Sequence, residues 1–187
     1  MRKIILSMSV SLDGFFEGPH REIDWHMVDD ELHWHFNEQL RPMSAFLDGR
    51  VTHELMADFW PTADAGPGVS GPMAEFAGIW RDMPKIVFSR TLERAGWNTT
   101  IRREVDADEI NELKARPGGD MALGGADLAA TFRRLDLIDE YRVYVHPVLL
   151  GRGRRLFHHA DATEDLRLAG SRAFGNGVVL LHYQRRA

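Results

Sequence analysis

The feature that most constrains the fold of this chain is the alternation of short apolar runs with segments of helical periodicity. Residues 3–12 and 85–89 are runs of apolar and β-branched residues, which is typical of buried strands. Residues 29–41 and 106–115 follow such runs and have the spacing of helices. Strands that alternate with helices form parallel sheets. We therefore predict a three-layer α/β/α fold with a mostly parallel central sheet.

Both ends of the helix expected at 29–41 are marked in the sequence. Asp29 is the predicted N-cap. The negative charges of Asp30 and Glu31 are stabilised by the positive end of the helix dipole. Pro42 stops the helix. We expect its buried stripe to consist of residues that recur every fourth position, namely Val28, Leu32, Phe36 and Leu40.

The remaining segments complete this outline. Residues 15–23 and 60–72 contain Gly and Pro and lack periodicity, so we expect loops there. Residues 140–147 alternate as a strand does. The last two runs, 166–172 and 177–184, are predicted to close the sheet as an antiparallel pair at its edge.

Length and composition limit the class of protein. A chain of 187 residues is expected to form a single domain over 1–187. The absence of cysteine excludes disulfides and thiolate chemistry and fits a reducing compartment. No run reaches the roughly 18 apolar residues that cross a bilayer, so we expect a cytoplasmic protein. A net charge of -5 argues against nucleic-acid or anionic-membrane partners.

Two junctions between a predicted strand and the next helix contain glycine. Gly49, Arg50 and Thr52 form the first, and Gly124 and Gly125 form the second. A helix that starts at such a junction presents backbone N–H groups to an anion, and glycine allows close approach. Arg50 could add a forked donor to a phosphate, and Thr52 a hydroxyl group.

The same residues have a simpler interpretation, since glycine often serves only to make a tight turn. Two such junctions on neighbouring strands favour a ligand site at the carboxyl ends of the strands. Ser89 and Arg90 follow a further strand and could bind a phosphate monoester, although a solvated turn would explain them too.

Five segments together resemble the dihydrofolate reductase superfamily, and most closely the reductase domain of the bifunctional riboflavin-biosynthesis deaminase–reductase. The long segment Leu137-Ile-Asp-Glu-Tyr-Arg-Val-Tyr-Val-His-Pro-Val-Leu-Leu-Gly-Arg-Gly153 is the most specific of them. The other four segments are Ser11-Leu-Asp-Gly14, Gly49-Arg-Val-Thr-His-Glu54, Val87-Phe-Ser-Arg-Thr91 and Gly124-Gly-Ala-Asp-Leu128. The resemblance spans nearly the whole chain, and the deaminase half is absent.

The resemblance implies a dihydrofolate-reductase-like fold, a homodimer, and NADPH as the hydride donor to a small heterocycle. It places Trp25 near the nicotinamide, and Leu123 where the riboflavin-type reductases have a glutamate that touches their substrate. This departure puts their pyrimidine substrate in doubt. The cofactor-binding residues that the resemblance implies are Gly49, Arg50, Thr52, Ser89, Arg90, Gly124, Gly125, Ala126 and Asp127.

Hydride transfer needs a proton as well, and three carboxylates are candidates for delivering it. Glu31 fits the pattern of dihydrofolate reductases, and Asp30 fits nearly as well. Half-burial beside a ring would raise the pKa of such a carboxyl group and suit it to this task. Their alternative role is to complement the helix dipole. Asp13 ends the first strand and could equally make a turn into Gly14.

Two further functions compete with a reductase. The first is a non-catalytic nucleotide-binding or regulatory protein on the same scaffold, suggested by Leu123 and by the uncertain carboxylate. The second is a metal-dependent hydrolase that uses His26, Asp30 and His33, which are spaced to share one helical face. Because this face lies opposite the apolar stripe, our prediction includes no metal site.

Overall fold

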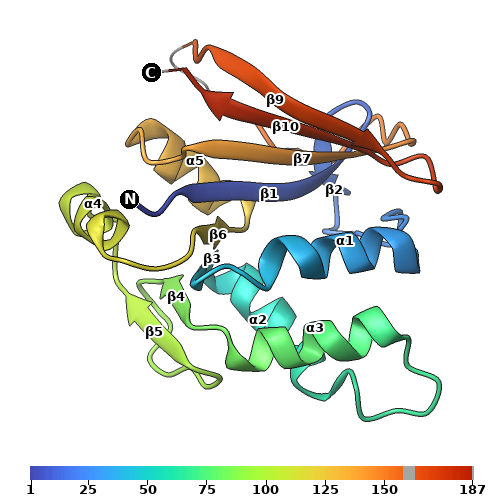
Figure 1. Ribbon diagram of the computed structural model, residues 1–187, viewed down its shortest axis with the longest axis horizontal. Coiled ribbons are helices and arrows are strands. Elements are labelled where there is room, and N and C mark those ends of the chain that lie inside the picture. Colours follow the sequence, from blue (N-terminus) through green and yellow to red (C-terminus); the bar gives the residue numbers. More distant parts are fainter. Residues whose placement is uncertain (158–162, 187) are drawn as a thin grey trace.

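The computed structural model describes residues 1–157 and 163–186, and within them an eight-stranded sheet has the order β5-β4-β3-β6-β1-β7-β10-β9 (Figure 1). All pairings from β5 to β7 are parallel, whereas β10 is antiparallel to β7 and to β9. This confirms the mostly parallel sheet with an antiparallel C-terminal pair. The strands are β1 Ile4–Ser11, β3 Ala45–Gly49, β4 Lys85–Phe88, β5 Thr99–Arg102, β6 Met121–Leu123, β7 Glu140–His146, β9 Leu166–Ala173 and β10 Val179–Arg185.

Helices cover both faces of the sheet, because neighbouring residues of each strand point to opposite sides. Phe46 packs in a cluster with residues of α2 and α3, and α1 packs on the same side. Leu47 lies in the cluster with residues of α4 and α5 on the other face. The three-layer α/β/α arrangement is thus confirmed. The helices are α1 Asp30–Leu40, α2 Arg50–Phe59, α3 Gly71–Asp82, α4 Ala107–Ala115 and α5 Ala126–Arg134.

The helices differ in how they begin. Side chains of Asp29, Ser70 and Asp106 accept hydrogen bonds from the first turns of α1, α3 and α4, which confirms Asp29 as an N-cap. Helices α2 and α5 begin after Gly49 and Gly125, and no side chain in the described part of the chain caps either of them. Their first N–H groups are therefore available to an acceptor outside the helix.

Three expectations about local structure are wrong. Residues 60–72 were expected to form a loop, but they contain the 3₁₀ helix η1 (Trp60–Thr62) and the start of α3. Ser70 caps α3, and Pro72 lies in the first turn, which tolerates proline. Within 15–23, the strand β2 (Phe15–Glu17) pairs with β8 (Arg154–Arg155). Val28 is 45% exposed because it precedes α1, whereas Leu32 is buried as expected.

Within the described residues, no helix is both long and apolar enough to span a membrane.

Candidate nucleotide-binding site

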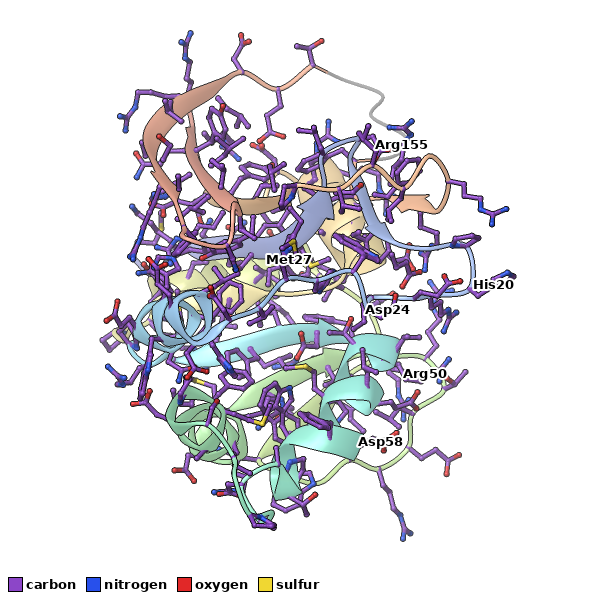
Figure 2. The ribbon with its side chains drawn as sticks, turned by 90° about the vertical axis from the view of Figure 1, so that its right-hand side faces the viewer. His20, Asp24, Met27, Arg50, Asp58 and Arg155 are labelled. Atoms are coloured by element: carbon purple, nitrogen blue, oxygen red, sulfur yellow. The ribbon has the colours of Figure 1, made fainter. Side chains whose placement is uncertain are left out.

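The parallel strands all end at one edge of the sheet, where β1, β3, β4, β6 and β7 finish. Figure 2 faces this edge: Arg50 marks the start of α2, and Asp24 and Met27 mark the segment 18–29 that leads to α1. In open α/β sheets this edge is where ligands bind. It is here that the structure brings the two glycine junctions together.

The two junctions are in direct contact. The N–H group of Gly124 donates to the carbonyl oxygen of Leu47 at 3.0 Å. A Cβ atom on Gly124 would lie 2.8 Å from Asp48 Oδ1, and one on Gly125 would lie 2.6 Å from Thr52 Oγ1. Gly125 also has a φ of +85°, which side chains disfavour. Packing within the protein therefore requires both glycines, and the same packing places the N-termini of α2 and α5 side by side.

Ion pairs organise the charged side chains at these helix starts. Arg50 pairs with Glu54 one turn along α2, at 2.7 Å. Asp127 lies in the first turn of α5 and accepts from Arg154 at 2.7 Å, and Arg154 also pairs with Glu17 at 2.7 Å. Arg154 was not predicted as a site residue, although it lies in a cluster with Arg152 and Arg155 that is visible in the sequence.

The turn after β4 is held from two sides. Ser89 Oγ accepts from the N–H groups of Thr91 and Leu92, at 3.2 and 2.9 Å. Arg103 donates through Nη1 to the carbonyl oxygens of Ser89, Arg90 and Leu92, at 3.2, 3.3 and 2.8 Å. The Arg90 side chain is exposed, so the turn presents its guanidinium group to solvent while Arg103 fixes the backbone. Arg103 was not predicted as a site residue, because its contacts with the turn depend on the pairing of β4 with β5.

The rise in pKa expected for a carboxyl group in the first turn of α1 is wrong for Glu31, and Asp13 also has a lowered pKa. Asp13 accepts from Ser11 Oγ at 2.6 Å and from the N–H groups of Gly151 and Leu150, and the Ser11 hydroxyl contributes most to lowering its pKa to about 2. The Gly175 N–H group and Arg172, each at 3.0 Å, hold the pKa of Glu31 below its usual range. These contacts favour structural roles for both residues.

The remaining predicted site residues lie as follows. Asp30 is exposed in the first turn of α1. Leu123 is buried in the core with Leu6 and Leu47, and its place beside a substrate remains a prediction. Trp25 lies in segment 18–29, and its placement near a nicotinamide remains a prediction.

The histidines expected to share a helical face are separated. His26 precedes α1 and stacks on His146, with ring centroids 5.2 Å apart. His33 packs against Trp60 and Phe76. Among the described residues there is no group of three or more His, Cys, Asp or Glu side chains that could hold a metal ion.

A buried acid and a buried lysine lie beneath the first junction, and sequence reasoning selected neither. Burial raises the pKa of Asp48, at the end of β3, to about 7. Burial lowers the pKa of Lys85, at the start of β4, to about 8. Lys85 Nζ donates to the backbone carbonyls of Trp80, Met83 and Trp97, the last two at 2.8 and 2.9 Å. Lys85 thereby ties the start of β4 to the end of α3 and to Trp97, and its charge lowers the Asp48 pKa without a direct contact between the two side chains.

Asp48→Asn should remove a pH dependence of stability. Since folding raises the Asp48 pKa from 3.8 to about 7, the folded protein holds a proton that the unfolded chain loses, and stability falls as pH rises through this window. The variant should match the wild type near pH 4 and exceed it at pH 8 by roughly 2 kcal/mol, given about 1.4 kcal/mol per pKa unit and some relaxation. Urea unfolding at both pH values measures this. Asp58→Asn, at an exposed position of α2 (Figure 2), should not alter the slope, and an unchanged slope in Asp48→Asn would refute the assignment.

Fold and edge together define a dihydrofolate-reductase-like α/β domain with two uncapped helix starts at the carboxyl edge of its sheet. The chain belongs to the family of the RibD C-terminal domain, whose model matches residues 2–180. This relates it to the reductase domains of riboflavin biosynthesis.

Relatives and solved structures agree with this placement. The uncharacterized proteins YyaP and YwjB of Bacillus subtilis (strain 168) are 35% and 29% identical, covering 97% and 98% of this chain and 94% and 98% of their own. A protein from Shewanella sp. PV-4 assigned to riboflavin biosynthesis has a TM-score of 0.75 at 20% identity, with both chains covered completely. A Thermotoga maritima diaminohydroxyphosphoribosylaminopyrimidine deaminase/5-amino-6-(5-phosphoribosylamino)uracil reductase has a TM-score of 0.66 at 16% identity, over 99% of this chain and 57% of that one.

Proposed function

We propose that this protein is an NADPH-dependent reductase that transfers hydride to a small pteridine-, pyrimidine- or flavin-like heterocycle and works as a homodimer. One observation supports this most. Helices α2 and α5 each begin directly after a glycine, lack a side-chain cap within the described residues, and meet at the carboxyl edge of the sheet. A pyrophosphate fits this arrangement, because it needs several N–H donors at a positive dipole end.

The residues at this edge fit the parts of NADPH. The N–H groups at the start of α2 and α5, with Thr52 Oγ1 between them, would hold the phosphates. The exposed guanidinium group of Arg90, on the turn that Arg103 fixes, would bind the 2′-phosphate. When bound, the cofactor supplies the hydride, and the protein binds it, orients it and excludes water.

The position of the carboxylates favours a second candidate, a non-catalytic nucleotide-binding or regulatory protein. Asp13 and Glu31 are held by backbone N–H groups and by hydroxyl or guanidinium donors, which suits them poorly to proton delivery. Leu123 lies in the core. This candidate predicts that NADPH binds and that no ring in a panel of heterocycles oxidises it.

Titration of tryptophan fluorescence with NADPH and NADH tests the nucleotide site. We expect NADPH to bind at least about tenfold more tightly, since a 2′-phosphate adds a charge-assisted contact. Arg90→Met should abolish this preference, whereas Arg94→Met, at an exposed position four residues further on, should preserve it. Equal or absent binding of the two nucleotides would overturn the proposal. Absorbance at 340 nm with a panel of pteridines, pyrimidines and flavins then separates the two candidates.

A further inference from the structure

A pair of histidine rings at the carboxyl edge has polar atoms without partners. His146 ends β7 and is fully buried, and its ring lies at 22° to that of His26, with centroids 5.2 Å apart. Within the described part of the chain, Nε2 of each ring is buried and has no hydrogen-bond partner. A buried polar atom without a partner costs about 1–3 kcal/mol, and such atoms in a native structure call for an explanation.

The hydrogen bond at Nδ1 of His146 determines whether Nε2 is a donor or an acceptor. The backbone N–H group of Met27 donates to Nδ1 of His146 at 3.1 Å, so Nδ1 must offer a lone pair. Burial, with a smaller contribution from His26, lowers the pKa of His146 to about 4, which keeps the ring neutral near pH 7. A neutral imidazole that accepts at Nδ1 carries its hydrogen on Nε2. Nε2 of His146 is therefore a donor that lacks an acceptor.

Trp25 covers both imidazoles. Its ring meets those of His26 and His146 edge-on, with centroids 4.3 and 5.6 Å apart. Its Nε1 donates to the carbonyl oxygen of Glu22 at 3.1 Å, within the same segment of chain. Residues 18–29 contain neither helix nor strand. Figure 2, which views the molecule from the carboxyl edge of the sheet, shows Met27 of this segment on the side facing the viewer. A rotation of Trp25 would uncover the donor at this edge.

We propose that His146 determines substrate specificity by donating from Nε2 to a carbonyl oxygen of a flat heterocyclic ring that replaces Trp25 over the two imidazoles. This inference rests on the proposed function and names the chemistry of its substrate. A neutral donor favours a ring carbonyl over a phosphate, which would need positive charge. A planar ring is favoured because it would occupy the place of the indole ring of Trp25, which packs against both imidazoles.

Two pyrimidines that differ at their ring oxygens test this. 5,6-Diaminouracil has two carbonyl groups, and 2,4,5,6-tetraaminopyrimidine has amino groups in their places. The wild-type protein with NADPH should bind the first at least tenfold more tightly by calorimetry, because the second leaves the Nε2–H group unsatisfied. His146→Phe should reduce this ratio to about one, and His146→Gln should restore part of it. His33→Phe, in the unrelated contact with Trp60 and Phe76, should keep the wild-type ratio.

Equal binding of the two rings, binding of neither, or a ratio that persists in His146→Phe would overturn the inference. NADPH affinity is measured separately on each variant, so loss of nucleotide binding remains distinguishable from loss of ring discrimination. Should His146→Phe fail to fold, nitrogen-15 spectra of the wild-type histidines decide. We expect His146 to carry its hydrogen on Nε2 and this signal to shift when 5,6-diaminouracil is added. A hydrogen on Nδ1, or an unmoved signal, would contradict the inference.

Discussion

Replacing Lys85 with methionine should lower the free energy of unfolding by about 3 kcal/mol, the usual scale for removing one partner of a buried charged contact. The ammonium group satisfies backbone carbonyls of Trp80, Met83 and Trp97, which methionine would leave buried without a donor. The variant would also deprive Asp48 of the cation that lowers its pKa. Urea unfolding at pH 7 measures the loss.

The double variant Lys85→Met/Asp48→Asn is the matched control. Since Asp48 and Lys85 interact electrostatically, the loss caused by Lys85→Met should be smaller in the Asp48→Asn background. A loss below about 1 kcal/mol in the single variant, of the order of an exposed pair, would show that Lys85 does not hold the sheet to α3. Strict additivity would show that the two residues act separately.

Gly125→Ala should weaken NADPH binding at least tenfold and cost about 2 kcal/mol of stability, in the range known for strained backbone. The alanine Cβ would lie 2.6 Å from Thr52 Oγ1 at a φ of +85°. The contact between the two junctions must open to accommodate it. Fluorescence titration and urea unfolding measure both effects on the same protein.

Gly78→Ala provides the control, because this glycine lies within α3 and its added Cβ meets nothing within 4 Å. It should bind NADPH as the wild type does, and it should gain stability by up to about 1 kcal/mol from the better helix former. A Gly125→Ala protein that keeps wild-type affinity would mean that the junction contributes nothing to nucleotide binding.

Much of the fold was predictable because its signals are local. The apolar runs and the cap Asp29 mark strands and a helix within a few residues of their ends. Helix α3 was missed because its start, Ser70-Gly71-Pro72, has the composition of a loop. The strand β2 was missed because its partner β8 lies far along the chain.

The candidate site also contains residues that local sequence predicts and residues that it does not. Its glycine junctions could be predicted, since strand, turn and helix follow one another in the sequence. The histidine pair could not, because the Met27–His146 hydrogen bond joins residues 119 positions apart. Asp48 is likewise buried against Gly124 of the second junction, which lies 76 positions further along the chain, and no local pattern indicates it. Asp13 and Glu31 were selected by position, whereas their contacts come from the turn at 148–151 and the β9–β10 turn.

The most direct test of a nucleotide held between α2 and α5 is to map backbone amide chemical shifts during titration with NADPH. Our account predicts the largest shifts at residues 49–52 and 124–127, with smaller shifts at 89–91 that NADH does not reproduce. Largest shifts at the capped starts of α1, α3 or α4, or none at either glycine junction, would contradict it.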